Sequence, residues 1–331
     1  MRSFEIGAND AGQRLDKFTA KAAPLLPQSL MYKYIRLKRI KVNSKRAEIS
    51  TRLSAGDVVD MYIDDSFFAP REDRYDFMTE SKNLDVAYED GNILVLDKKP
   101  GLLCHPDAGQ YSDTLIGRVK RYLYEKGEYD PAAENSFVPA LANRIDRNTG
   151  GLVLAAKNAA ALRVLNEAIR VRDVKKLYLC VTVGVPKKKE GILAGYITKD
   201  EKSNTVSVSG KREDGAKTAK LSYRVLDSKN GLSLVEVDLL TGRTHQIRAQ
   251  FAGAGTPLLG DGKYGRNEAN KANGGYRKQL LYSYSLTFLF EKTEAGPLSY
   301  LAGKTVTAGD VWFVKAFNDG TLKGGGGRKN G

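Results

Sequence analysis

The segment "NRIDRNTGGLVLAAKN", residues 143–158, combines a lone acidic residue with the start of an apolar run. Asp146 stands between Arg144 and Arg147, and two glycines precede the apolar "LVLAA". If residues 140–146 are extended, Arg144 and Asp146 point to one face and Arg147 to the other. The glycines permit a positive φ or the close approach of another backbone, including that of a nucleic acid. Asp146 is therefore a surface ion pair, a metal ligand or an ionised catalytic group.

The segment "VKKLYLCVTVG", residues 174–184, alternates as a strand does. One face carries Leu177, Leu179, Val181 and Val183. Tyr178 lies on the other face with Cys180 and Thr182. Its ring is either an ordinary core aromatic or the stacking surface that an unstacked base requires.

The segment "VEVDLLTGRTHQIRAQFAGAG", residues 235–255, predicts a strand, a turn and a short helix. Thr244 is the expected N-cap, and the glycines at 253 and 255 are expected to end the helix. On such a helix, Ile247 and Phe251 face the core.

The polar residues of this helix lie near its start. His245 and Arg248 are three residues apart and therefore neighbours on one side. A helix N-terminus with Arg243 and Arg248 beside it suits an anion, either a phosphate or a carboxylate such as Asp146. The density of hydrogen-bond donors at this corner favours a site over a solvated helix.

Composition limits the partners. Lys and Arg outnumber Asp and Glu by 53 to 39, and the resulting net charge of +14 indicates a polyanionic partner. Cys104 and Cys180 lie in separate apolar segments, which argues against a disulfide framework or a thiolate metal site. The first residues lack the apolar run of a signal peptide, and no stretch approaches the ~20 apolar residues of a membrane span. We therefore expect a soluble protein of the cytoplasm.

The first 65 residues read as a small, basic α/β unit. Leu15, Phe18, Ala22 and Leu25 recur at helical spacing, and a second helix is expected after Ser29 as N-cap. Between residues 30 and 46 the basic side chains have no acidic neighbour and are Lys33, Arg36, Lys38, Arg39, Lys41, Lys45 and Arg46. With Tyr32 and Tyr34 among them, this pattern favours a phosphate-contacting surface over a solvated helix face.

The stretches "RLDKFTAK", "YKYIRLKRIKVN" and "LSAGDVVDMYI" resemble the small RNA-binding domain shared by a small-subunit ribosomal protein and tyrosyl-tRNA synthetases. The resemblance covers about fifty residues and implies that this unit docks RNA through a basic helix and hairpin.

The rest of the chain divides into three parts. Residues 66–84 are mostly polar without a sustained period and are expected to be a linker. Residues 85–316 contain recurring strands, beginning with a hairpin around Asp90-Gly91-Asn92, with helices spaced too irregularly for a βαβ repeat. We expect an α+β domain built on a mixed, largely antiparallel sheet with flanking helices. Residues 317–331 are polar and Gly-rich and are expected to be a disordered tail.

Taken with "DKKPGLLCHP", residues 97–106, and "TPLLGDGKYG", residues 256–265, the three segments resemble the RluA-type family of RNA pseudouridine synthases. The likeness runs from about residue 85 to 290. It implies a mixed β-sheet core with the active site in a cleft. Members with an amino-terminal RNA-binding domain mostly act on large-subunit (23S) ribosomal RNA, which favours that substrate over transfer RNA.

The resemblance also implies roles for individual residues. Asp146 matches the essential catalytic aspartate, Tyr178 the tyrosine that packs on the target base and takes part in proton removal, and Arg248 the arginine that pairs with the aspartate. Arg144 matches an arginine that holds the flipped nucleotide or fills its gap. We expect Arg243 and His245 to contact RNA as well. The family usually has His at the position of Asn143 and Ser at that of Gly150.

The chemistry fits these residue types. Isomerising uridine breaks the N1–C1′ bond and joins C5 to the same carbon without redox change, so no cofactor is expected. An ionised carboxylate can act as a nucleophile or remove a sugar proton, and Arg248 would oppose the effect of burial on that carboxylate. The base must also leave its stack.

Three alternative functions explain the sequence less well. A metal-dependent nuclease lacks clustered ligands, since His105 and His245 are the only histidines, and we expect no metal. A Ser-His-Asp hydrolase lacks the G-x-S-x-G elbow. A non-catalytic RNA-binding protein explains the charge but not the Asp, Tyr and Arg constellation. A monomer is expected, and the choice of uridine is expected to depend on loops such as residues 265–279.

Overall fold

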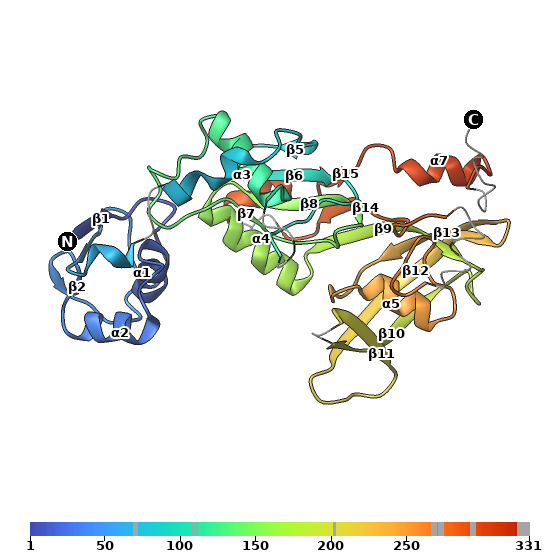
Figure 1. The fold of residues 1–331 in the computed structure, drawn as a ribbon, viewed down its shortest axis with the longest axis horizontal. Helices are drawn as coiled ribbons and strands as arrows, with labels where there is room; N and C mark the ends of the chain where they lie inside the picture. Colours follow the sequence, from blue (N-terminus) through green and yellow to red (C-terminus); the bar gives the residue numbers. More distant parts are fainter. Residues whose placement is uncertain are drawn as a thin grey trace.

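The computed structural model describes residues 1–68, 72–107, 109, 112–200, 203–265, 270, 275–291 and 296–322, the side chains of residues 72–74 excepted. A small unit with its own sheet lies at one end of an elongated molecule, and a long sheet runs through the rest (Figure 1). No helix in these ranges combines the length and apolarity needed to cross a membrane.

The N-terminal unit pairs four antiparallel strands in the order β1-β4-β2-β3. Its elements are β1 (Arg2–Glu5), α1 (Leu15–Ala22), α2 (Gln28–Arg36), β2 (Ile40–Val42), β3 (Lys45–Arg46), β4 (Val58–Met61) and the 3₁₀ helix η1 (Asp65–Phe67). Leu15, Phe18 and Ala22 are buried in one cluster with Met31 and Ile35. Helical periodicity therefore identified the face of α1 that packs on α2.

Two details of this unit differ from expectation. Leu25 lies beyond α1 and is 57% exposed, because the helix ends at Ala22 before Pro24. Ser29 is inside α2, whose N-cap is Pro27 without a side-chain capping bond.

The long sheet has the order β11-β10-β12-β13-β9-β14-β8-β6-β5, with β15 on β14 and β7 on β8. Its strands are β5 (Val86–Glu89), β6 (Ile93–Lys98), β7 (Ala140–Leu141), β8 (Gly150–Ala156), β9 (Val174–Val183), β10 (Glu190–Asp200), β11 (Thr205–Ser209), β12 (Lys217–Lys229), β13 (Leu232–Asp238), β14 (Leu281–Phe288) and β15 (Thr305–Thr307). All described pairs are antiparallel except β14 with β8. The α+β class with a mixed, largely antiparallel sheet is confirmed.

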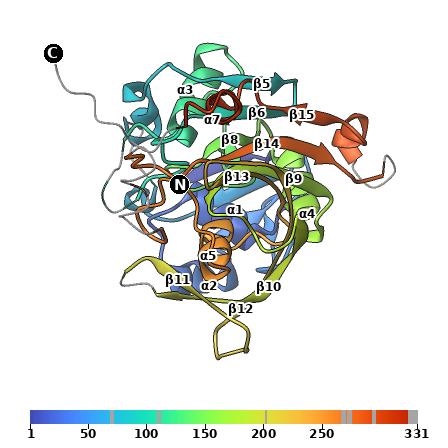
Figure 2. The same cartoon turned by 90° about the vertical axis from the view of Figure 1, so that its right-hand side faces the viewer.

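Helices cover both faces of this sheet (Figure 2). They are η2 (Glu72–Thr79), α3 (Leu115–Glu125), α4 (Ala159–Val171), α5 (Gln246–Gly253), η3 (Gly296–Leu301) and α7 (Trp312–Asn318). Alternate residues of β6 and β8 enter different cores: Leu152 and Leu154 pack with α4, whereas Val153 and Ala155 pack with α3. Burial on both faces explains why "LVLAA" is continuously apolar.

The same alternation operates in β9, in the middle of the sheet. Leu179 and Val181 pack with α7, whereas Tyr178 and Cys180 pack with α5. The predicted division of the two faces is confirmed, and α5 and α7 lie on opposite sides of this region (Figure 2).

The expected boundaries shift where apolar side chains pack. Phe68 is buried in the N-terminal core, and Phe77, in η2, is buried against α3 and Tyr129. Part of the expected linker at 66–84 is thus packed structure. At the other end Phe317 and Leu322 are buried, so packed structure continues past residue 317. Residues 323–331 of the expected tail lie outside the described residues.

Polar contacts join the N-terminal unit to the rest. Ser136 donates to Asp10 at 2.5 Å, and Asn135 donates to the same carboxylate at 2.9 Å. Arg163 of α4 donates to the carbonyl of Ala11 at 3.2 Å. The junction is hydrogen-bonded, and each unit keeps its own apolar core.

Candidate active site

A cavity of about 390 Å³ opens where β9, α5 and the loop after β7 meet. Six residues singled out by sequence line it: Arg144, Asp146, Tyr178, Arg243, His245 and Arg248. They come from three segments far apart in the chain. The structure therefore brings together the constellation that the three motifs predicted, and the basic residues of α2 and β2 are not among its lining.

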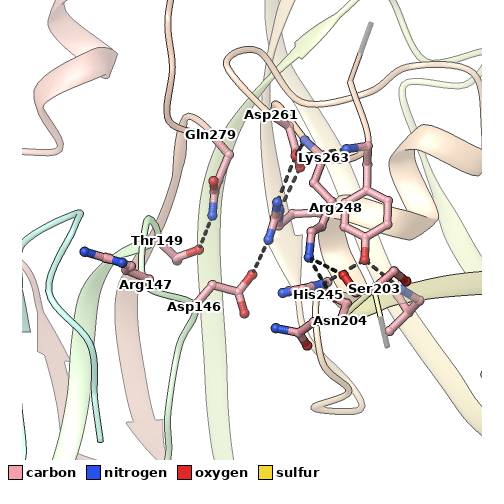
Figure 3. A network of polar contacts seen from close by, with 12 residues as sticks. Asp146, Arg147, Thr149, Ser203, Asn204, His245, Arg248, Asp261, Lys263 and Gln279 are labelled. Atoms are coloured by element: carbon pink, nitrogen blue, oxygen red, sulfur yellow. Dashed lines mark hydrogen bonds and ion pairs between the residues drawn. The ribbon is translucent and has the colours of Figure 1, made fainter. Parts of the chain in front are cut away.

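Arg248, which lines the cavity, joins the carboxylates of Asp146 and Asp261 (Figure 3). Its Nη1 donates to Oδ2 of Asp146 at 3.0 Å. Its Nε and Nη2 donate to the two oxygens of Asp261 at 2.7 and 2.8 Å. Burial works against the charge of Arg248, but hydrogen bonds and the charge of Asp261 and Asp146 raise its pKa. The arginine is therefore a permanent cation.

Asp146 occupies a loop. The strand predicted over residues 140–146 ends at Leu141, and a turn follows in which the Thr149 N–H donates to the Asp146 carbonyl at 3.0 Å. The buried Lys98 ammonium fixes this loop by donating to three carbonyls, including that of Arg147 at 2.9 Å. Burial lowers the pKa of Lys98 to about 8.

The two glycines after this turn are required by β14. A Cβ on Gly151, which has φ +108, would lie 2.2 Å from the carbonyl oxygen of Ser283. A Cβ on Gly150 would lie 2.4 Å from the ring of Tyr282. The sequence was compatible with the close approach of a protein or a nucleic-acid backbone to these glycines. In the structure, the backbone of β14 makes this approach at Gly151.

Tyr178 reaches the cavity from β9 and is only 5% exposed. Burial and, to a smaller extent, the charge of Asp146 raise its pKa to about 12. The hydroxyl therefore remains protonated at neutral pH.

His245 is the N-cap of α5, with a left-handed φ of 52° and no capping bond from its side chain. The expected cap at Thr244 is wrong by one residue. The Tyr264 hydroxyl accepts from the Val206 N–H and lies 2.8 Å from Nδ1 of His245. The Tyr264 hydroxyl and Nδ1 therefore share a hydrogen bond, and the tautomer of His245 decides which of the two donates. Burial lowers the pKa of His245, which favours the neutral imidazole.

The other arginines differ in orientation. Arg147 donates from Nε to the Gly101 carbonyl at 3.1 Å, and its side chain is directed away from the Asp146 carboxylate (Figure 3). It nevertheless lines the rim of the cavity with Arg144. Arg243 donates from Nε to the Thr218 carbonyl at 3.0 Å and remains exposed.

The basic side chains of the N-terminal unit face solvent. Lys33, Arg36, Lys38 and Arg39 are exposed, and Lys41 is half-buried. The Arg39 guanidinium lies 5.4 Å from the Tyr34 ring centroid, and the Lys41 ammonium lies 5.2 Å from that of Tyr62. The tyrosines thus hold part of this charge in place.

The local sequence pattern predicts no role for Asp261, Lys98 or Gln246. Asp261 and Lys98 lie in the quoted stretches "LLGDGKYG" and "DKKPGLLCHP". No helical or strand periodicity predicts that either residue lies close to Asp146. Gln246 accepts from the Arg243 N–H at 3.1 Å and so fixes the turn before α5. Within the described ranges, no cluster of three or more His, Cys, Asp and Glu side chains could hold a metal ion.

Comparison with known proteins identifies the family. The sequence model described as RNA pseudouridylate synthase matches residues 92–253. An RNA pseudouridine synthase of Mycoplasma capricolum is 31% identical over 318 residues, 95% of this chain and 100% of the relative. The chain belongs to the RNA pseudouridine synthase family. It is an enzyme that isomerises uridine to pseudouridine, and its substrate is RNA.

Other relatives of this pseudouridine synthase carry more specific names. The ribosomal large subunit pseudouridine synthase C of Rickettsia felis is 33% identical over 265 residues, covering 77% of this chain and 82% of the relative. Among solved structures, human RNA pseudouridylate synthase domain containing 4 superposes with a TM-score of 0.54 at 21% identity, covering 71% of this chain and 92% of that one. That likeness confirms the fold.

The two departures from the family pattern have structural explanations. The Asn143 side chain accepts from the Leu154 N–H at 2.8 Å and so belongs to the support of β8, and it is not among the residues lining the cavity. Gly150 makes room for the ring of Tyr282, whose hydroxyl donates to Asp97 at 2.5 Å.

Proposed function

We propose that this pseudouridine synthase modifies one or a few uridines of large-subunit ribosomal RNA, with Asp146 as the essential catalytic carboxylate. One observation carries the assignment to Asp146: its Oδ2 is held by Arg248, and among the described residues its Oδ1 has no hydrogen-bond donor. Asp146 lines the same cavity as Tyr178. A charged oxygen without a protein partner is available to a substrate.

The reaction requires little besides such an oxygen. The N1–C1′ bond of uridine breaks, uracil turns, and C5 bonds to C1′ as the C5 proton leaves and N1 gains one. Asp146 assists glycosidic cleavage as a nucleophile at C1′ or by taking a proton from the sugar. Arg248 holds the carboxylate in place in either case.

Tyr178 serves the base. Its ring is proposed to stack on the flipped uracil, an interaction worth about 1–3 kcal/mol per base. Because its pKa is about 12, the hydroxyl is protonated when the base binds. It is proposed to act as a relay that accepts the C5 proton while it gives its own proton to a water, which passes a proton on to N1.

Donors around the rim are proposed to hold the flipped nucleotide. His245 is proposed to offer Nε2–H to a uracil or ribose oxygen while the Tyr264 hydroxyl donates to Nδ1. Arg144 and Arg243 offer charge to neighbouring phosphates or to the gap left in the RNA.

The N-terminal unit is proposed to be an RNA-docking domain, separate from the catalytic domain that is built on the long sheet. Its support is the basic surface formed by the exposed Lys33, Arg36, Lys38 and Arg39 with the half-buried Lys41. Ribosomal RNA is favoured because relatives are named large-subunit synthases. We propose that the enzyme acts as a monomer in the cytoplasm.

The test is a map of pseudouridine by carbodiimide labelling and primer extension over ribosomal and transfer RNA. Cells carry the wild-type protein, no protein, or Asp146→Asn. We expect one or a few large-subunit sites that vanish in both altered strains. Identical maps in all three strains would support a non-catalytic RNA-binding role, and a site confined to transfer RNA would overturn the proposed substrate.

A further inference from the structure

We propose that Asp261 is a positioning residue for catalysis, which occupies the forked edge of Arg248 so that Asp146 keeps one oxygen free for the substrate. The inference rests on the proposed role of Asp146. It begins with the geometry of three charged groups that meet at a single guanidinium.

Asp261 binds the edge of the Arg248 guanidinium that carries two parallel donors. The Nε and Nη2 donors form a parallel pair that matches both oxygens of a carboxylate, and Asp261 accepts from both at 2.7 and 2.8 Å. Asp146 receives one bond, from Nη1 to Oδ2 at 3.0 Å. With its fork occupied, Arg248 cannot bind both oxygens of Asp146 through that edge.

Asp261 is itself immobilised. Its side chain is fully buried, and Oδ1 also accepts from the N–H groups of Lys263 and Tyr264 at 2.9 and 3.1 Å. Its carbonyl accepts from the Asn270 side chain at 3.1 Å. Burial disfavours the charge of Asp261, but the bonds from Arg248 and these N–H groups keep its pKa below the ordinary value. The anion is therefore present in the folded protein before RNA binds.

The guanidinium is also held against an aromatic ring. The Tyr264 ring centroid lies 5.1 Å from the carbon of the Arg248 guanidinium, and Tyr264 also bonds to His245. Arg248 is thus fixed by Asp261 on one edge and flanked by Tyr264. Such preorganisation gives Asp146 a fixed direction without consuming both of its oxygens.

The charges lead to the same conclusion. Two carboxylates share one guanidinium, so the three groups together carry a net negative charge. Without Asp261, the freed fork of Arg248 would be available to Asp146. A bidentate pair is stronger but would engage the oxygen that the reaction needs.

The first experiment measures kcat and KM of Asp261→Asn on the RNA site found by mapping. Asparagine keeps the shape of the side chain but offers one acceptor in place of two. We expect kcat to fall about 100-fold, the size associated with misplacing a catalytic group, while KM changes less than about twofold because Asp261 does not reach the RNA. Glu89→Gln, a similar change in a charge cluster elsewhere, is the control and is expected to keep the wild-type kcat.

A double-mutant cycle tests whether Asp261 acts through Arg248. In the Arg248→Lys background there is no fork to hold, so adding Asp261→Asn should change kcat by less than about threefold. Independent losses that multiply would overturn the proposal. A wild-type kcat for Asp261→Asn would also overturn it.

A crystal structure of Asp146→Asn gives a second route that does not depend on how an Asp261 variant folds. We expect Arg248 to stay on Asp261 with both bonds intact. Displacement of the guanidinium would mean that Asp146, and not Asp261, fixes its position. The two proposals fail separately: an active Asp146→Asn refutes the proposed function, whereas an inactive Asp146→Asn with a fully active Asp261→Asn refutes only the positioning role.

Discussion

Glu89 and Asp146 are carboxylates of similar exposure in opposite circumstances. Their side chains are 19% and 24% exposed, and both lie beside permanent cations. Glu89 accepts from Lys126 at 2.6 Å, from Lys157 at 3.1 Å and from Tyr122 at 2.7 Å, so both of its oxygens are used. Asp146 lines the cavity, and among the described residues Arg248 alone bonds to it, through one of its two oxygens. The difference teaches that burial and a nearby cation do not distinguish a site from a structural cluster, whereas an unused oxygen does.

The largest effect short of removing Asp146 is expected from Arg248→Lys, which converts the held carboxylate into a loosely paired one. Lysine keeps the charge but cannot engage both carboxylates in the same geometry. We predict a loss of kcat of about 1,000-fold, the upper range for removing a preorganised donor. Single-turnover kinetics on the mapped RNA site measures it. A loss under tenfold would show that charge alone suffices.

Tyr178→Phe separates the hydroxyl from the ring beside Asp146. The phenyl ring keeps the stacking surface, so RNA affinity should hold, while kcat is expected to fall about 100-fold for loss of a proton-transfer group.

The protonation state of Tyr178 predicts how kcat depends on pH. With a raised pKa of about 12, the hydroxyl stays protonated until well above pH 10. Wild-type kcat should therefore be flat from pH 7 to 9. A tenfold rise per pH unit over that range would instead identify a phenolate as the active form.

A smaller effect is expected from the exposed basic face. Replacing Lys33, Arg36 and Lys38 by Gln should weaken RNA binding about tenfold and reduce the slope of affinity against salt by about 2, with kcat unchanged at saturation. The matched control replaces Lys187, Lys188 and Lys189 by Gln. These exposed lysines lie between β9 and β10, and their replacement removes the same amount of positive charge. Equal losses of RNA affinity in the two triple variants would show that RNA binding depends on overall positive charge and not on a docking surface in the N-terminal unit.

The smallest effect on catalysis is expected from Glu89→Gln, which breaks the saturated cluster. Although burial opposes the charge of Glu89, its hydrogen bonds to Lys126, Tyr122 and Lys157 lower its pKa to about 2. Its stabilisation is therefore complete above the unfolded pKa of about 4.3 and is lost as pH falls toward 2.

Urea unfolding of the Glu89→Gln variant measures this contribution. At pH 7 we predict a loss of about 1–2 kcal/mol after allowance for solvent screening, and the gap to wild type should close as the pH falls. A gap that is constant with pH would show that the lost interaction does not depend on ionised Glu89.

Periodicity gave the parts of the fold in which alternate residues enter different cores. The two faces of β9 and the hairpin at Asp90 followed from local pattern, because burial and turn chemistry are local properties. The burial of Phe77 was not predicted, because this residue lies in a mostly polar stretch. It packs against α3, which lies about forty residues away in the chain.

The site was partly predictable for the same reason. The motifs placed Asp146, Tyr178 and Arg248 in one cavity, but Asp146 was expected in a strand and lies in a turn fixed by the distant Lys98. The pairing of Arg248 with Asp261 depends on a loop returning to α5, which no helical or strand periodicity encodes.

The most direct test of the central claim is the rate of pseudouridine formation by Asp146→Asn under single-turnover conditions, with Glu89→Gln measured alongside. Asparagine retains the shape of the side chain but removes the charge from the oxygen that Arg248 does not bind. We predict no detectable product from Asp146→Asn, unchanged RNA affinity, and wild-type rates from Glu89→Gln. Product formation by Asp146→Asn within tenfold of wild type would contradict the role assigned to that oxygen.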